Sequence, residues 1–141
     1  MGFISNRTGE LISDIEHQMM SRAYQAAQAL KKAELQVLRG QGGGRRYRVP
    51  GTGASYTASA PGQPPAVRTG AYRSSYVPRA EQKSGNVYRS LIESGLSVNG
   101  WYLGNLLENG TSKMAPRPHD ERIIQKALPE ISRIYNRPFM R

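Results

Sequence analysis

Apolar side chains recur at three- and four-residue steps over the first forty residues of the chain. The series is Ile12, Ile15, Met19, Ala23, Ala26, Leu30, Ala33 and Val37. This spacing predicts a helix of about seven turns with one apolar stripe, rich in alanine and methionine. The opposite, polar face carries Glu10, Asp14, Gln18, Arg22, Gln25, Lys32 and Gln36. We expect the helix over residues 8–39, capped by Thr8, ended by Gly40 and buried against a partner through its stripe.

Residues 40–67 show no apolar periodicity and are rich in glycine, proline, serine and arginine. A stretch of this length is either a disordered linker or an extended arm that orders on a partner, and Tyr47 and Tyr56 favour the arm. The run Gly42-Gly43-Gly44 lacks the lysine and hydroxyl residue of a phosphate-binding loop. We therefore expect these glycines to supply flexibility.

Alternating and apolar segments then predict a small antiparallel β-sheet. They comprise Tyr72, Ser74 and Tyr76, followed by Val87 to Ser94 and Leu96 to Val98, with turn residues at 84–86 and Gly95. Next comes the most apolar cluster of the chain, Trp101, Tyr102, Leu103, Leu106 and Leu107. We interpret it as a short helix or an irregular segment that caps the sheet. We also expect Trp101 in the core, because a single tryptophan in an apolar cluster is usually buried.

The end of the sequence predicts a C-terminal helix. Pro118 stands near its first position, Asp120 and Glu121 lie in its first turn, and Arg133 and Arg137 lie at its far end. Its apolar stripe is Ile123, Ile124, Ala127, Leu128, Ile131 and Ile134. Pro129 cannot donate a hydrogen bond inside this helix, so it should kink or restart it.

The loop before that helix carries rigid backbone residues. Asn109-Gly110 tolerates the positive φ of a tight turn, and Pro116 and Pro118 hold Arg117 extended, which we expect to project its guanidinium outward. A loop shaped in this way is typical of a contact surface. The sequence contains no comparable arrangement for catalysis.

The formal charge of +10 and the sequence pI near 10.3 indicate a polyanionic partner, either nucleic acid or an acidic protein surface. Residues 39–83 hold eight basic residues and only Glu81 as an acid. Since the chain has no cysteine, a disulfide framework and a thiolate site are unavailable. No apolar run reaches a membrane span or a signal peptide, so we expect a soluble protein made in the cytoplasm, without membrane contact.

The residues that most often perform chemistry are sparse. His17 and His119 are the only histidines, and near them in sequence only Asp14 and Asp120 could add a ligand. A metal site needs three or four converging ligands, so we expect two exposed helical histidines and no metal. No nucleophile turn or paired carboxylates appear, which favours a protein that is not an enzyme and uses no cofactor.

Five segments, taken in order, resemble the tail-completion or head-to-tail joining proteins of long-tailed double-stranded DNA bacteriophages. They are Gly44 to Arg48, Ala58 to Ala66, Thr69 to Tyr76, Leu107 to Met114, and Arg117-Pro118. The resemblance covers roughly residues 10–135. The family usually has leucine where this chain has Tyr72, an aromatic residue at Asn109 and phenylalanine at His119.

This resemblance implies a single α+β domain over residues 1–141, with a long N-terminal helix, an extended Gly/Pro-rich arm at 40–67, and a small antiparallel sheet plus a C-terminal helix at 68–141. It also implies a structural virion protein, assembled in the bacterial host cytoplasm. Such a protein forms a ring in the phage neck, between the head connector and the tail tube or tail terminator. Sixfold order is favoured for this ring, and twelvefold order is the alternative.

The residues that we expect to contact a subunit or partner lie on the arm and on the following loop. They are Arg45, Arg46, Tyr47, Arg48 and Tyr56, together with Gly110, Thr111, Lys113, Met114 and Arg117. The alternative is a basic protein that binds nucleic acid without sequence preference through the same arm, and non-specific contact with packaged DNA fits either reading.

Overall fold

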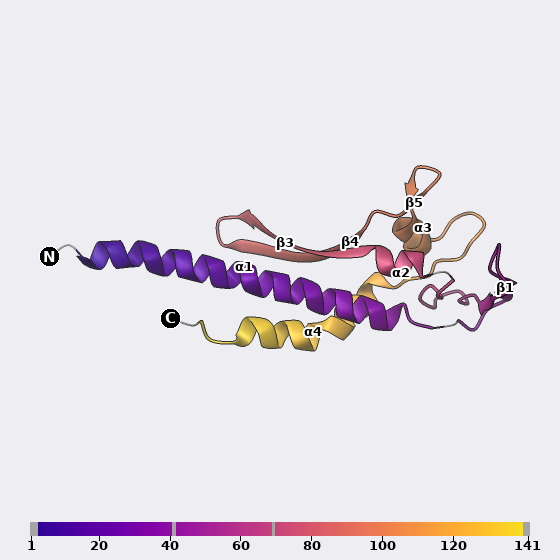
Figure 1. The fold of residues 1–141 in the computed structure, drawn as a ribbon, viewed down its shortest axis with the longest axis horizontal. Helices are drawn as coiled ribbons and strands as arrows, with labels where there is room; N and C mark the ends of the chain where they lie inside the picture. Colours follow the sequence, from indigo (N-terminus) through magenta and orange to yellow (C-terminus); the bar gives the residue numbers. More distant parts are fainter. Residues whose placement is uncertain (1–2, 41, 69, 140–141) are drawn as a thin grey trace.

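The computed structural model describes residues 3–40, 42–68 and 70–139. Its first element, helix α1 (Phe3–Val37), runs along the length of the molecule, as Figure 1 shows. The helix begins earlier than predicted, since the expected cap Thr8 lies inside it. Gly40 follows with φ of 94°, the left-handed conformation expected of the residue that ends a helix.

Within the described residues, three separate antiparallel strand pairs replace the single small sheet that the sequence predicts. Strands β1 (Arg46–Arg48) and β2 (Ser55–Thr57) pair in the arm, β3 (Tyr76–Ser84) pairs with β4 (Val87–Ser94), and β5 (Ser97–Val98) pairs with β6 (Trp101–Tyr102). The fold is α+β as expected. The predicted strand around Tyr72 and Ser74 is wrong, because these residues form the short helix α2 (Ala71–Ser75).

Two further helices follow in the described part of the chain after β6. Helix α3 (Leu103–Asn109) follows β6, and α4 (Asp120–Asn136) lies beside α1 (Figure 1). Asp120 and Glu121 occupy the first turn of α4 as predicted. The helix runs through Pro129 as one element and does not restart there. None of the described helices combines the length and apolarity that a membrane span needs.

The core lies where α1 meets α4 and the β3–β4 hairpin. Ala33, Ile123 and Ala127 are its buried centre, with Leu30 and Ile92 among the half-buried residues around it. Alanines at 23, 26, 27 and 29 are also buried. Small side chains let the backbones approach closely, so packing of the alanine stripe in this part of α1 is confirmed.

The predicted faces of α1 need two corrections. Ile12 is 54% exposed and Ile15 is 36% exposed, because the first half of the helix extends beyond the elements that cover the second half (Figure 1). Arg22, predicted on the polar face, is buried. Its guanidinium donates to the carbonyl oxygens of Tyr135 at 3.1 Å and Pro138 at 2.9 Å, so it ties the end of α4 to α1.

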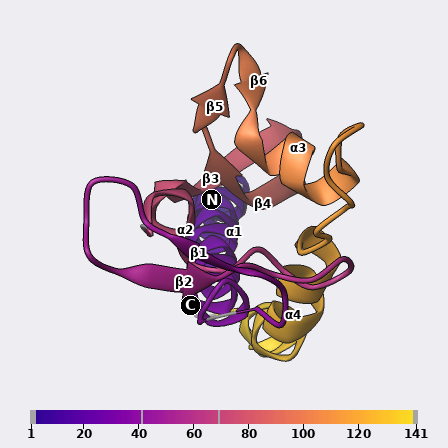
Figure 2. The same cartoon turned by 90° about the vertical axis from the view of Figure 1, so that its right-hand side faces the viewer.

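The aromatic cluster is also placed differently from the prediction. Trp101 is 69% exposed and Tyr102 is 60% exposed, because the β5–β6 hairpin projects from the body (Figure 2). Of the C-terminal stripe, Ile123, Ala127 and Ile134 are buried, whereas Ile124 and Leu128 remain exposed. The short helix or irregular segment predicted for the cluster at 101–107 is helical only from Leu103, where α3 begins, because Trp101 and Tyr102 form β6.

Candidate functional site

The arm is folded into a hairpin and is not simply extended. In β1 and β2, Tyr47 stands opposite Tyr56, and their rings stack with centroids 6.0 Å apart. The guanidinium of Arg45 lies over the Tyr47 ring at 5.7 Å. Cross-strand aromatic pairs stabilise short strands, and three-residue strands are too short to give a detectable periodicity.

The cationic side chains of the hairpin face solvent. Arg45, Arg46 and Arg48 are exposed, and Arg46 donates to the Ser55 hydroxyl through Nε at 2.9 Å and a terminal nitrogen at 2.8 Å. Since Arg46 and Arg48 are two residues apart on one strand, they share a face of the hairpin. The arm therefore presents a small basic surface at one end of the molecule (Figure 1).

Two glycines of the 42–44 run serve close packing, so the expected flexibility is wrong for them. A Cβ on Gly42 would lie 2.2 Å from Cα of Ser59, and one on Gly44 would lie 2.8 Å from the Ala58 carbonyl oxygen. Their amides donate to the carbonyl oxygens of Thr57 at 3.0 Å and of Ala58 at 2.8 Å. Only glycine permits the two parts of the arm to lie this close.

Arg117 points into the protein and not outward as predicted. Its Nε donates to the Ser59 hydroxyl at 2.8 Å, and a terminal nitrogen donates to the Ala115 carbonyl at 2.9 Å. Its backbone amide donates to the Leu107 carbonyl at 2.6 Å. The flanking prolines fix the backbone, but the docked arm supplies the acceptor, which no local pattern could indicate.

The loop after α3 has the expected backbone turn. Gly110 has φ of 78°, and a Cβ at this position would lie 2.8 Å from both the Met114 carbonyl oxygen and the Pro116 nitrogen. Thr111 and Met114 exchange backbone hydrogen bonds of 2.8 and 3.3 Å across the turn, which leaves Lys113 exposed. The positive φ predicted for Asn109-Gly110 is confirmed at Gly110.

The arm and this loop form one unit, here called the arm-loop framework and made of residues 42–63 and 110–117, with position 41 outside the described part of the chain. Besides the contact of Arg117 with Ser59, the Gly62 amide donates to the Pro116 carbonyl at 3.1 Å. A terminal nitrogen of Arg122 donates to the Gly62 carbonyl at 3.0 Å, which ties the framework to α4. All ten predicted contact residues lie on this framework, although no partner chain is present to test their role.

His119 is buried, which contradicts the expected exposed histidine. Only 1% of the residue is exposed, and Nε2 lies 2.7 Å from the Tyr72 hydroxyl, which lies 2.7 Å from the Tyr76 hydroxyl. Nδ1 lies 2.8 Å from the Arg117 carbonyl oxygen. One assignment satisfies every group: Nδ1–H donates to that carbonyl, Tyr72 donates to Nε2, and Tyr76 donates to Tyr72.

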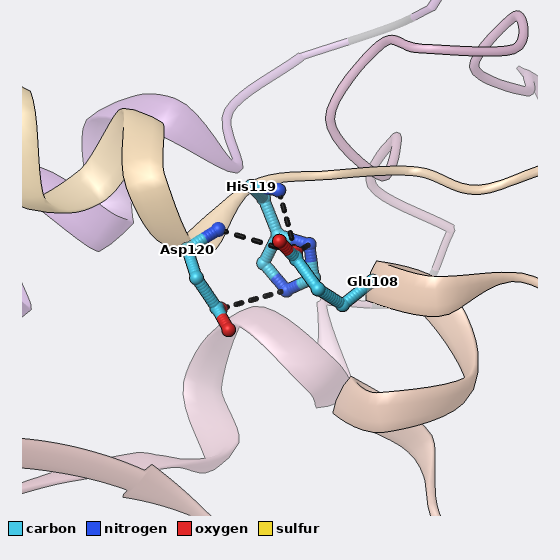
Figure 3. Close-up of side chains that lie close together, drawn as sticks. All are labelled: Glu108, His119 and Asp120. Carbon is cyan, nitrogen blue, oxygen red and sulfur yellow. Dashed lines mark hydrogen bonds and ion pairs between the residues drawn. The ribbon is translucent and has the colours of Figure 1, made fainter.

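Glu108, which sequence reasoning missed, joins α3 to α4 (Figure 3). Its Oε2 accepts hydrogen bonds from the backbone amides of His119 at 2.7 Å and Asp120 at 3.2 Å, and it lies 3.0 Å from His119 Nδ1. A carboxylate at the start of a helix satisfies amides that otherwise lack partners. Because this cap comes from eleven residues upstream, no capping pattern predicts it.

Burial shifts several ionisation equilibria in this cluster. Desolvation raises the pKa of the Asp120 carboxyl, and the neighbouring charge of Glu108 raises it further, whereas His119 opposes the shift. Burial also raises the pKa of Tyr76 to about 12 and that of Tyr72 well above its ordinary value. Both phenols therefore stay protonated and can donate hydrogen bonds at neutral pH.

Glu108, His119 and Asp120 offer ligand atoms within 4.8 Å of one another, a spacing that a metal ion can use. These atoms already have partners. Both ring nitrogens of His119 are engaged, and Glu108 Oε2 caps α4. A metal would have to displace Tyr72 or the Arg117 carbonyl, so the geometry supports a structural joint that positions α4 under the arm-loop framework.

The chain was compared with family models, curated proteins and solved structures, and none of the three comparisons found a match. The functional assignment therefore depends on the geometry above and on the resemblance described for the sequence.

Proposed function

We propose that this chain is a structural virion protein of a long-tailed bacteriophage, which assembles as a ring in the neck and joins the head connector to the tail. The arm-loop framework carries this proposal. It unites two parts of the chain that also carry the family resemblance, and the contacts of Arg117, Gly62 and Arg122 tie these parts to each other and to α4.

Rigid loops suit permanent contacts between proteins. A surface that is already ordered loses little conformational entropy when it binds, so more of the contact free energy appears as affinity. The framework presents Tyr47, Arg48 and Lys113 at its surface, and the glycines at 42, 44 and 110 permit close packing that a Cβ would prevent. These features favour docking on a neighbouring subunit or ring over a reaction centre.

Electron microscopy tests the proposal directly. Class averages of the purified full chain should contain closed rings, and a label fused to the chain should appear at the neck of virions that carry it. Purified protein without rings, together with a label found at another place on the virion, would contradict the assignment.

Binding of nucleic acid by the arm is a second candidate function. It is favoured by the exposed Arg45, Arg46 and Arg48 and by the lack of any aspartate or glutamate between residues 35 and 80. Binding through phosphates weakens steeply as salt rises, and removal of one phosphate contact lowers the slope by about one. Titration of duplex DNA at several salt concentrations, with wild type and Arg48→Gln, distinguishes this candidate. A shallow slope that the substitution leaves unchanged would exclude it.

A further inference from the structure

One end of the molecule is an unpartnered helix face. From residue 9 to residue 21 of α1 no side chain is buried, and burial begins at Arg22. Leu11 is 49% exposed, Ile12 54% and Ile15 36%. These three residues lie within about 100° of one another around the helix axis, so they form a continuous apolar face in solvent.

This segment has little to stabilise it in a single copy. Helices in proteins depend mainly on the packing of an apolar face, and this end of α1 has no such packing. The segment also contains Gly9, which disfavours helix. A partner that covers Leu11, Ile12 and Ile15 would supply the missing packing.

The charge of this end is opposite to that of the rest of the chain. Residues 8–21 contain Glu10, Asp14 and Glu16 and no lysine or arginine, although the chain as a whole has a formal charge of +10. An acidic, amphipathic helix binds most favourably to an apolar surface with basic edges.

Such a surface lies at the opposite end of the molecule. A groove of about 480 Å³ between the arm and α3 is lined by apolar residues that include Leu38, Leu103 and Met114. Arg68, Arg73 and Arg117 also line it, and none of its described lining residues is acidic. A larger groove of about 940 Å³ beside β4 has Glu93 and Asp120 on its walls, so its charge opposes an acidic helix.

The helix cannot reach the basic groove of its own chain. Leu38, at the end of α1, lines the groove, whereas Ile15 lies 23 residues earlier on the same straight element (Figure 1). At 1.5 Å per residue that separation is about 35 Å. A helix of this kind can therefore bind in the groove only from a second molecule.

We propose that residues 9–21 of α1 in one copy bind, apolar face inward, in the basic groove of a second copy. This contact is heterologous, since each copy offers a helix at one end and a groove at the other. Repeated contacts of this kind close into a ring when the rotation between successive copies permits it. The inference rests on the proposed function for its biological setting and names the contact that would build such a ring.

Sedimentation velocity of nuclease-treated full chain, measured over a concentration series, tests the contact. Ile15→Asp should weaken self-association at least about tenfold, because the carboxylate would be buried in an apolar contact. His17→Asp is the matched control, since it adds a carboxylate on the opposite side of the helix and should leave association unchanged or stronger. Circular dichroism verifies that both variants keep wild-type helicity.

Arg68→Glu tests the groove, with Lys126→Glu as its control, because Lys126 is exposed on α4 and does not line the groove. Arg68→Glu should reduce self-association and Lys126→Glu should not. Ile15→Asp retains an intact groove, and Arg68→Glu retains an intact helix. Mixed in equal amounts, the two variants should form dimers and nothing larger, because only one productive contact remains.

Several results would overturn the inference. These are a wild-type chain that stays monomeric at roughly 1 mM, assembly that disappears with nuclease, equal effects of Ile15→Asp and His17→Asp, or mixed variants that do not associate. The mixing result is independent of the assignment to the phage neck. If the mixed variants form dimers but the labelled chain is not found at the neck of virions, the contact between copies stands and the proposed function is rejected.

Discussion

Gly110→Ala perturbs the turn on which the arm-loop framework depends. Gly110 has φ of 78° and ψ of 177°, a combination that is essentially restricted to glycine, and the new Cβ would lie 2.8 Å from two backbone atoms. Gly51 is a matched control, because it has φ of 76° but no atom within 4 Å of its Cβ position. Both substitutions share the cost of a positive φ, about 1–2 kcal/mol, and the gain from a less flexible unfolded chain.

The difference between the two variants reports the steric contact together with the strain from the ψ of 177° at Gly110. Forcing a methyl group against packed atoms costs about 1–3 kcal/mol. Gly110→Ala should therefore lower the free energy of unfolding by at least that much more than Gly51→Ala. For a chain of this size the excess corresponds to about 3–12 °C in Tm.

Urea and thermal unfolding followed by circular dichroism at 222 nm measure this difference, since α1 and α4 dominate the signal. Trp101 fluorescence is a poor probe, because that side chain is 69% exposed in the native state. Equal destabilisation by the two substitutions would refute the argument, as it would mean that the loop is not packed around Gly110.

Three further predictions concern the framework and the core. Gly42→Ala should detach the arm and increase proteolysis at Arg45, because the new Cβ would lie 2.2 Å from the backbone of Ser59. Gly43→Ala should have little effect, because its Cβ would meet only a flexible side chain at 3.3 Å. Equal rates of proteolysis in the two variants would contradict the packed arm. Glu34 is fully buried, and burial raises the pKa of its carboxyl above 4.5, so it stabilises the fold below that pH and loses this contribution as the pH rises through the raised value. Wild type should accordingly lose stability relative to Glu34→Gln as the pH rises above about 4.5 in urea titrations. A constant difference between the two proteins would show that this group does not titrate differently in the folded state. Arg117→Lys keeps the charge but loses the planar guanidinium that donates to both a hydroxyl and a carbonyl. It should lower the free energy of unfolding by about 1–2 kcal/mol without changing the fold. An unchanged free energy of unfolding would mean that the guanidinium geometry adds no stability.

The sequence by itself determined the parts that depend on local rules. The three- and four-residue recurrence predicted α1 and α4, the residues at 84–86 predicted the turn between β3 and β4, and the positive φ at Gly40 and Gly110 followed from residue type. Each of these features is set by interactions among neighbouring residues, which a pattern along the chain records.

Only the tertiary structure decided which side chains are covered. Ile12 and Trp101 belong to apolar patterns in the sequence but are exposed to solvent, because no other described element extends far enough to cover them. Arg22 and His119 are polar residues that the sequence predicts to be exposed, but both are buried. Hydrogen-bond acceptors and donors distant in the sequence satisfy their side chains. Burial and hydrogen-bond pairing are properties of elements brought together in space, so a side chain's neighbours in the sequence indicate its secondary structure but leave its contacts undetermined.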